Sequence, residues 1–253
     1  MRKIIKYVLF CIETILIFLF VGAMTTAITK NVYSRILVEE FKSKGVLNEE
    51  KSTKFTKIYE IESNEVIPTY TYYGTKIAPG NKGDIIISLT SEIEIPVVKE
   101  FISFFAGGHA SLVLDEFSDD NIFGNSNRVV ETTGLNPDNN LSIIGGKNYW
   151  ISNSIYDEVI VVRVKMTDKE RKKVISKGVS LFGDPYNFSF IVDTKNKSYC
   201  SDLVNKAFSS IGVNLNKDGF TTSVYDLVVR NETYISYYHY FDKEGIKHIY
   251  YLV

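Results

Sequence analysis

From Ser198 to Gly212 the chain reads SYCSDLVNKAFSSIG. Apolar residues recur there at the three- and four-residue spacing of an amphipathic helix, at Leu203, Val204, Ala207, Phe208 and Ile211. Gly212 follows the pattern, as glycine commonly does where a helix ends. The spacing therefore predicts a helix that begins near Ser198, with Cys200 in its first turn and on its inward face.

The position of Cys200 favours a reactive thiol. The first turn of a helix presents unpaired backbone N–H groups and the positive end of the helix dipole. This environment lowers the pKa of a thiol, and the same N–H groups can stabilise an oxyanion during acyl transfer. The other cysteine, Cys11, lies in an apolar N-terminal run, so a disulfide between the two is awkward. The sequence indicates that Cys200 is a nucleophile; the alternative is a small buried apolar residue.

A thiol nucleophile needs a base, and the chain has three histidines. His109 follows Gly107 and Gly108 and heads an apolar segment, where small neighbours leave room for another element to approach the imidazole. His239 and His248 lie in an aromatic tail, and we interpret both as surface or peripheral packing residues. We therefore expect His109 to be the base.

An imidazole base works best when a third group fixes its tautomer. Glu131 is an isolated acid within the apolar segment around Val129 and Val130. Asp115 is a second candidate, but it begins an acidic stretch that is typical of a solvated loop. Glu131 is thus the preferred orienting group, although solvent on its face of a strand would explain it equally well.

Other chemistries have little support in the sequence. No pair of His or Cys residues has metal-ligand spacing, so we expect no metal, and no glycine-rich loop suggests a phosphate or cofactor site. No Gly-x-Ser-x-Gly elbow indicates a serine hydrolase. The formal net charge of -1 gives no general attraction for nucleic acid.

The remaining pattern predicts an α+β domain whose antiparallel sheet packs on helices. Short β-branched runs predict strands, and helical spacing predicts helices. The expected strands are 85–89, 110–114, 128–133, 159–164 and a tail from Tyr234; the expected helices are 95–105 and 167–182 besides the one containing Cys200.

The N-terminal segment differs in composition from the globular domain. Arg2, Lys3 and Lys6 precede an apolar run from Tyr7 to Thr29 that contains one charge, Glu13. Because a helix crosses a bilayer with roughly 20 residues, we expect a transmembrane anchor. The basic flank should remain in the cytoplasm, which places the rest of the chain outside.

A cleaved secretory signal is the rival interpretation. Val21-Gly22-Ala23 and Thr25-Thr26-Ala27 both resemble small-residue cleavage sites. The resulting division of the chain is an anchor or signal segment over 1–30, a stalk and lead-in over 31–79, and a globular domain over 80–253.

Five short motifs occur in the same order as similar motifs of a known family. They are Gly83-Asp84-Ile85-Ile86, Gly108-His109-Ala110-Ser111-Leu112-Val113, Val130-Glu131-Thr132, Gly183-Asp184-Pro185-Tyr186-Asn187 and Tyr199-Cys200-Ser201-Asp202-Leu203-Val204. Together they resemble the permuted papain-like amidases of the YaeF/YiiX type, distant relatives of NlpC-type cell-wall peptidases. The resemblance spans about Pro79 to Arg230. It implies a permuted papain-like fold in which the sheet carrying His precedes the helix carrying Cys.

The resemblance also implies roles for particular residues. By position, Cys200, His109 and Glu131 match the family's nucleophile, base and orienting carboxylate. Tyr199 matches a tyrosine often found before the nucleophile, which makes it a candidate for lining the substrate pocket. Tyr186 matches the turn tyrosine and is a weaker pocket candidate, because plain packing would explain it equally well. The implied reaction is hydrolysis of an amide without a cofactor.

Three functions follow as hypotheses. The first is a cysteine amidase or peptidase outside the cytoplasm, acting on cell-envelope peptides through an acyl-enzyme. The second keeps the fold but acts on lipid-linked substrates as a thioesterase or acyltransferase. The third is an inactive, membrane-anchored binding domain that uses the groove for recognition.

Overall fold

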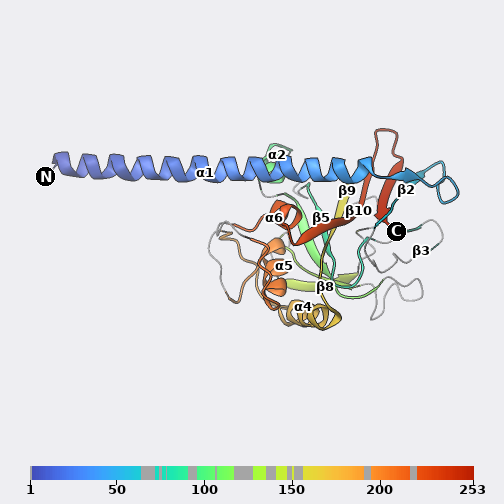
Figure 1. Ribbon diagram of the computed structural model, residues 1–253. Helices are drawn as coiled ribbons and strands as arrows, with labels where there is room; N and C mark the ends of the chain where they lie inside the picture. Colours follow the sequence, from blue (N-terminus) through green and yellow to red (C-terminus); the bar gives the residue numbers. More distant parts are fainter. Residues whose placement is uncertain are drawn as a thin grey trace.

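The structure is a computed structural model that describes residues 2–63, 72–73, 76–77, 79–90, 96–105, 107–116, 128–134, 141–146, 150, 156–190, 195–216 and 221–253 (Figure 1). Its helices are α1 (Arg2–Ser43), α2 (Pro96–Phe105), α4 (Asp168–Ser180), α5 (Cys200–Ser209) and α6 (Val224–Val229). Its strands are β1 (Val46–Leu47), β2 (Thr56–Ile61), β3 (Tyr72–Tyr73), β4 (Lys76–Ile77), β5 (Ile85–Ser88), β6 (His109–Val113), β7 (Arg128–Thr132), β8 (Ser142–Gly146), β9 (Glu158–Val164), β10 (Thr233–Phe241) and β11 (Lys247–Leu252).

One large sheet organises the domain. Its strand order is β1-β2-β11-β10-β9-β5-β6-β7-β8, and β3 pairs with β4 apart from it. The strands pair antiparallel, as expected, except that β11 pairs with β2 in parallel, so the sheet is mixed. The two strands come from opposite ends of the domain's sequence, so a parallel pairing needs no tight turn between them.

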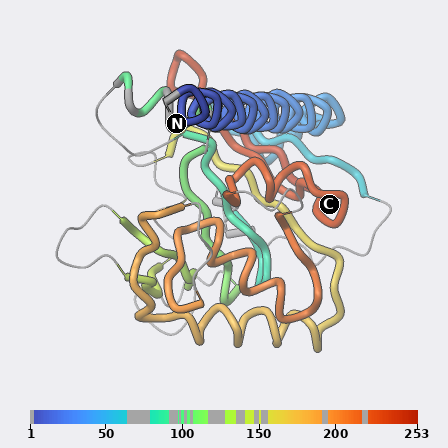
Figure 2. Tube along the Cα trace, turned by 90° about the vertical axis from the view of Figure 1, so that its left-hand side faces the viewer, coloured from blue at the N-terminus to red at the C-terminus, as the bar shows by residue number. Residues whose placement is uncertain are grey.

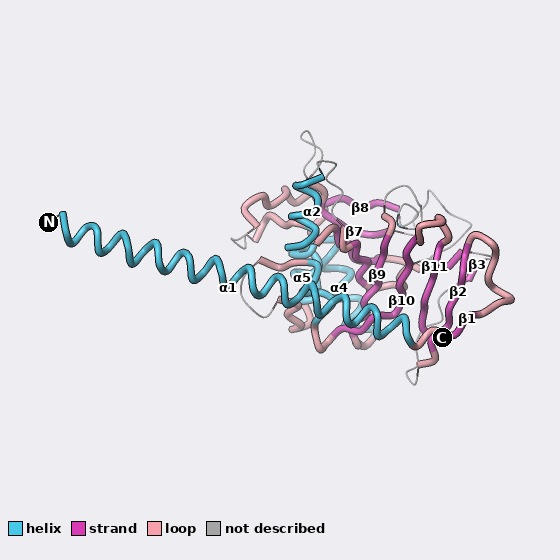
Figure 3. Tube along the Cα trace, turned by 90° about the horizontal axis from the view of Figure 1, so that it is seen from above, coloured by secondary structure: helices cyan, strands magenta, loops and turns pink. Residues whose placement is uncertain are grey.

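The sheet is buried on both faces, which explains why its central strands read as continuous apolar runs. Ala110, Leu112 and Val130 lie in the core shared with α4, α5 and α6, whereas Val113 and Val129 belong to the core on the opposite face. Figure 3 shows α4 and α5 next to the central strands. Side-chain alternation along β6 and β7 therefore separates the two cores.

Capping explains where α4 begins. Thr167 Oγ1 accepts the Glu170 N–H, and the Glu170 carboxylate accepts the Thr167 N–H at 2.8 Å. This capping box stabilises the first turn and confirms the start predicted for that helix. β8 and α6 lie in segments where the sequence pattern predicted neither a strand nor a helix.

α1 is one continuous helix of 42 residues. Its N-terminal half projects away from the domain, and its C-terminal half lies along it (Figures 1 and 3). Large apolar side chains from Ile4 to Val21 are exposed. The helix is long and apolar enough to cross a membrane, a test that an N-terminal signal sequence also passes.

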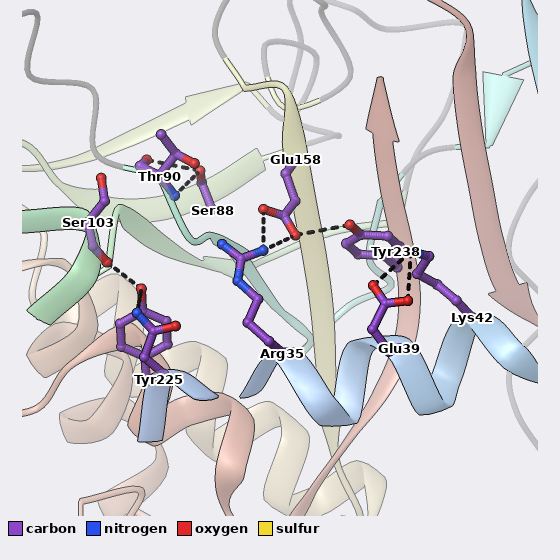
Figure 4. Close-up of polar contacts among 10 residues, drawn as sticks. Arg35, Glu39, Lys42, Ser88, Thr90, Ser103, Glu158, Tyr225 and Tyr238 are labelled. Atoms are coloured by element: carbon purple, nitrogen blue, oxygen red, sulfur yellow. Dashed lines mark hydrogen bonds and ion pairs between the residues drawn. The ribbon is translucent and has the colours of Figure 1, made fainter. Parts of the chain in front are cut away.

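Specific contacts fix the second half of α1 to the domain. Val38 and Phe41 are buried in the core. Arg35 Nη1 reaches both carboxylate oxygens of Glu158, at 2.6 and 2.8 Å, and the Tyr238 hydroxyl donates to the same carboxylate (Figure 4). Part of the segment we expected to be a stalk is thus packed helix, and β1 and β2, from the same segment, belong to the main sheet.

A second polar link continues the docking of α1 toward its middle. Lys30 forms an ion pair with Asp226, at the first turn of α6. The Asn31 side-chain amide donates to the Phe104 carbonyl at 2.9 Å and to the Tyr225 hydroxyl at 3.1 Å. The helix is therefore held along most of its second half rather than at one point.

Asp84, from the first of the five motifs, has a structural role. Arg163 donates to it through two nitrogens, each at 2.7 Å, and both side chains are almost wholly buried. Asp84 also accepts the Asn81 N–H at 2.8 Å, which closes the turn before β5. The pair joins that turn to β9.

Asp84→Ala should destabilise the chain by about 3–5 kcal/mol, because it leaves the Arg163 charge buried without its carboxylate. Chemical denaturation of the full chain in detergent measures the change. Asp115→Ala is the matched control, since Asp115 pairs with the more exposed Arg128 and such pairs contribute about 0–1 kcal/mol. Equal losses in the two variants would contradict this role of Asp84.

Candidate active site

Cys200 is the first residue of α5, as the apolar spacing predicted. Leu203, Val204 and Ala207 are buried and hold the helix against the sheet. The N-cap residue, Tyr199, makes no side-chain capping hydrogen bond. The first-turn N–H groups therefore do not have the usual side-chain acceptor and face the neighbourhood of the thiol.

His109 is the first residue of β6, and two glycines shape the approach to it. A Cβ on Gly108 would lie 2.0 Å from the Thr90 carbonyl oxygen. Gly107 has a φ of 80°, and a Cβ there would lie 1.9 Å from a methyl group of Val224. Only glycine fits at both positions, so the close packing before β6 explains the Gly-Gly-His sequence.

The structure brings Cys200, His109 and Glu131 together. His109 Nε2 lies 3.0 Å from Glu131 Oε2, and the Cys200 thiol hydrogen-bonds the imidazole. Because Nε2 faces the carboxylate, Nδ1 is the nitrogen left for the thiol. Glu131 is 3% exposed, so this carboxylate is shielded from water.

Strand alternation places His109 and Glu131 on the sheet face opposite to the core of α5. His109 nevertheless reaches Cys200 because it stands at the end of β6, where the strand no longer separates the two faces. The Trp150 ring stacks on the imidazole, with centroids 5.7 Å apart and planes 6° from parallel. Trp150 is fully buried and limits rotation of the imidazole.

Burial raises the pKa of Cys200, but the hydrogen bond and charge of His109, with the N–H groups of Ala110 and Ser201, outweigh it and lower the pKa below its usual value. Burial also lowers the pKa of His109, yet Cys200 and Glu131 together hold that pKa well above its usual value. The two shifts share a cause, because each group stabilises the charged form of the other. The site favours a thiolate–imidazolium pair.

The register of β6 explains why the Ala110 N–H is available. Leu112 pairs with Val130, and the Leu114 N–H donates to a β7 carbonyl at 2.9 Å. The backbone N–H groups of even-numbered residues in this strand therefore point toward β7. Ala110 has the same parity, but the pairing of the two strands ends at Leu112. Its N–H donates to the Cys200 sulfur instead.

Both tyrosines from the motifs lie near the thiol. Tyr199 is 6% exposed, and its hydroxyl accepts the Thr222 N–H at 2.8 Å. Burial raises the pKa of Tyr199, and the charges of Asp202 and Cys200 add to the shift. Burial and the charges of Cys200 and Tyr199 raise the pKa of Tyr186 as well.

The other candidates lie elsewhere. Asp115 pairs with Arg128 at 2.6 Å, and His248 pairs with Asp242 at 2.9 Å. His239 is fully buried within β10 beside the Tyr237 hydroxyl, so its interpretation as a surface or peripheral residue is wrong.

Two further features of the described residues bear on the site. These residues contain no group of three or more His, Cys, Asp or Glu side chains that could hold a metal ion. A cavity of about 810 Å³ lies between α1, α6 and the start of β10, lined by residues such as Phe41, Ile61 and Val164. It includes none of the residues gathered around Cys200.

Residues 80–232 match the family described as permuted papain-like amidase enzyme, YaeF/YiiX, C92. The chain belongs to this family. The family assignment confirms the resemblance and makes the chain a member of a group of papain-like amidases. No curated protein matches the chain significantly.

Among solved structures, the crystal structure of the metalloprotein yiiX from Escherichia coli O157:H7 is similar to the chain. Sequence identity is 16%, the TM-score is 0.45, and the match covers 62% of this chain and 96% of that one.

His109→Ala should slow alkylation of Cys200 by iodoacetamide. The lowered pKa of Cys200 keeps the wild-type thiol reactive below the usual thiol range near 8.5, and loss of His109 raises that pKa. At pH 6 the rate should fall about tenfold for each unit by which the pKa rises. Mass spectrometry of the Cys200 peptide, in a Cys11→Ser background, measures the rate.

His248→Ala is the matched control, because His248 is a partly buried, carboxylate-paired histidine outside this cluster. In this variant the rate of Cys200 alkylation should depend on pH as it does in the parent protein. Equal alkylation rates in His109→Ala and the parent protein would exclude the pairing of Cys200 with His109.

Proposed function

We propose that this amidase-family protein is a membrane-tethered cysteine hydrolase that cleaves an amide bond outside the cytoplasm. The observation that carries the proposal is the contact series from the Cys200 thiol to His109 and on to Glu131, with 3.0 Å between His109 Nε2 and Glu131 Oε2. In this arrangement a nucleophile, a base and an orienting carboxylate act as one unit.

In the first half of the reaction, the Cys200 thiolate attacks the carbonyl carbon. The resulting oxyanion is stabilised by backbone N–H groups at the start of α5. The imidazolium of His109 gives its proton to the leaving amine as the C–N bond breaks, which leaves an acyl group on the sulfur.

In the second half, neutral His109 takes a proton from water, and the hydroxide attacks the thioester. Collapse of the second tetrahedral intermediate releases the acid and returns the thiolate and the imidazolium. Glu131 holds Nε2 of His109 in both halves, and Tyr199 and Tyr186 line the approach to the sulfur.

Cys200→Ser should abolish amide hydrolysis, and His109→Ala should lower kcat by about 10²–10⁴-fold, the usual contribution of a general acid–base. Glu131→Gln should lower kcat while leaving the protein folded. Glu116→Gln, at an exposed acid on the loop after β6, should have no effect. Product release from purified peptidoglycan fragments, followed by mass spectrometry, measures these rates.

An acyl adduct on Cys200 should also accumulate when the reaction is quenched early. A wild-type protein that cleaves neither peptide nor lipid substrates, and a Cys200→Ala strain with an unchanged cellular phenotype, would contradict hydrolysis. That pair of results would instead support a binding domain.

We further propose that α1 is a retained anchor rather than a cleaved signal. The helix continues without a break through the two sites that resemble signal cleavage sites, and Lys30 and Asn31 bind the domain directly after them. The basic residues before the apolar run favour a cytoplasmic N-terminus.

The mature chain should therefore keep residues 1–29 and sediment with membranes. Intact-mass measurement and membrane flotation test this, and protease added to spheroplasts should digest the domain. A mature N-terminus at residue 24 or 28, with the protein in the soluble fraction, would exclude the anchor.

A lipid-directed thioesterase or acyltransferase is the second candidate function. The observation that favours it is the pair of exposed rings, Phe188 and Phe190, next to Tyr186 and Tyr199. Incubation with acylated lipids in parallel with peptidoglycan distinguishes the two functions by product mass.

A further inference from the structure

Because α1 is packed rigidly on the domain, a bilayer that surrounds its exposed half also has a defined position relative to the domain. A flexible linker would let the domain turn freely, but α1 continues as one helix into its packed half. Arg35 binds Glu158, Lys30 binds Asp226, and Val38 is buried. These contacts leave the exposed apolar half of α1 in a defined direction from the domain.

An aromatic loop, residues 186–190, carries large apolar side chains that face solvent. Phe188 is 58% exposed and Phe190 is 43% exposed. The Phe188 ring lies 4.7 Å from the ring of Tyr186, and the Phe190 ring lies 5.3 Å from that of Tyr199. The two exposed rings thus border the tyrosines beside Cys200.

The backbone of the aromatic loop is held in place. Phe190 has a φ of 54°, a left-handed conformation that is costly for an aromatic residue. Its carbonyl oxygen accepts a hydrogen bond from Thr221 Oγ1 at 2.8 Å. A defined contact therefore stabilises the conformation in which Phe190 remains partly exposed.

The aromatic loop lies at the end of the domain that faces the projecting half of α1. Figures 1 and 3 show the connections around α5 at that end, and β1 and β2 at the other. Figure 2 views the domain from the same end, with the orange segments between α4 and α6 grouped below α1. The exposed rings are thus on the side where a bilayer around α1 would lie.

The chemistry of the neighbouring segment fits a bilayer surface. Lys195 and Lys197 are exposed just before α5. Aromatic rings at headgroup depth with lysines beside them are typical of interfacial membrane contacts. Because the whole chain carries a net charge of -1, this attraction to anionic headgroups is local.

We infer that the aromatic loop inserts Phe188 and Phe190 into the interface of the same bilayer that holds α1. The contact places the mouth of the candidate site at the membrane surface. The inference rests on the proposed anchoring of α1 and does not depend on catalysis.

Tryptophan fluorescence in brominated-lipid vesicles tests the inference on the full chain. Phe188→Trp adds one reporter, and Trp150, the natural tryptophan, is fully buried, so the wild-type signal can be subtracted. The matched control is Phe55→Trp, at another exposed phenylalanine (68%) on the turn before β2. Leu16→Trp reports insertion of α1 itself.

We expect brominated phospholipid to quench the Phe188→Trp reporter and a blue shift of its emission relative to the protein in detergent without lipid. Phe55→Trp should show neither change, and Leu16→Trp should be quenched strongly. Quenching at Leu16→Trp without quenching at Phe188→Trp would overturn the aromatic-loop contact alone. Absence of quenching at Leu16→Trp would overturn both the anchor and the contact. Equal quenching at Phe188→Trp and Phe55→Trp would show non-specific adsorption and would also overturn the inference.

Discussion

The packing of α5 against the central strands determines where the thiol lies. Leu112, on β6, and Ala207, on α5, are close neighbours of Gly178 in α4, where an added Cβ would lie 2.7 Å from the Leu112 side chain. Leu112 also shares one buried core with Leu203 and Ala207 of α5, and this packing holds α5 beside β6. Without it, the Cys200 sulfur would lose the imidazole, the Ala110 N–H and its lowered pKa together.

The electrostatics of the site follow from that one contact. Burial disfavours the charged forms of both His109 and Cys200, and each of the two groups stabilises the charged form of the other. The Glu131 carboxylate, on the far side of the imidazole, also raises the pKa of His109. The arrangement favours charge separation in the resting site, so less reorganisation would be needed in the proposed reaction.

Much of this could be predicted from the sequence, because the decisive signals are local. Helical spacing located α5, the shortage of histidines indicated His109, and a capping box fixed the start of α4. Glu131 was harder to choose. Extending the register of β6 and β7 puts it opposite Ser111, diagonal to His109 on the same face, and only a known register distinguishes it from Asp115.

Other features were beyond sequence reasoning for a physical reason. The Ala110 N–H becomes available only because β7 stops pairing at Leu112, and Trp150 meets His109 across a long sequence separation. The parallel pairing of β2 with β11 depends on tertiary closure rather than on any local pattern. His239 was misjudged because polar and aromatic neighbours in the sequence do not reveal which strand is central.

The continuous helix α1 has a consequence for how the protein would meet its targets. A stiff helix neither lengthens nor coils, so with α1 in a bilayer the thiol would stay at one fixed height above the membrane. Targets farther from the membrane would have to come to the height of the thiol themselves. The search for substrate would then be two-dimensional, by lateral diffusion of the anchored protein, with the orientation of the domain already set before each encounter.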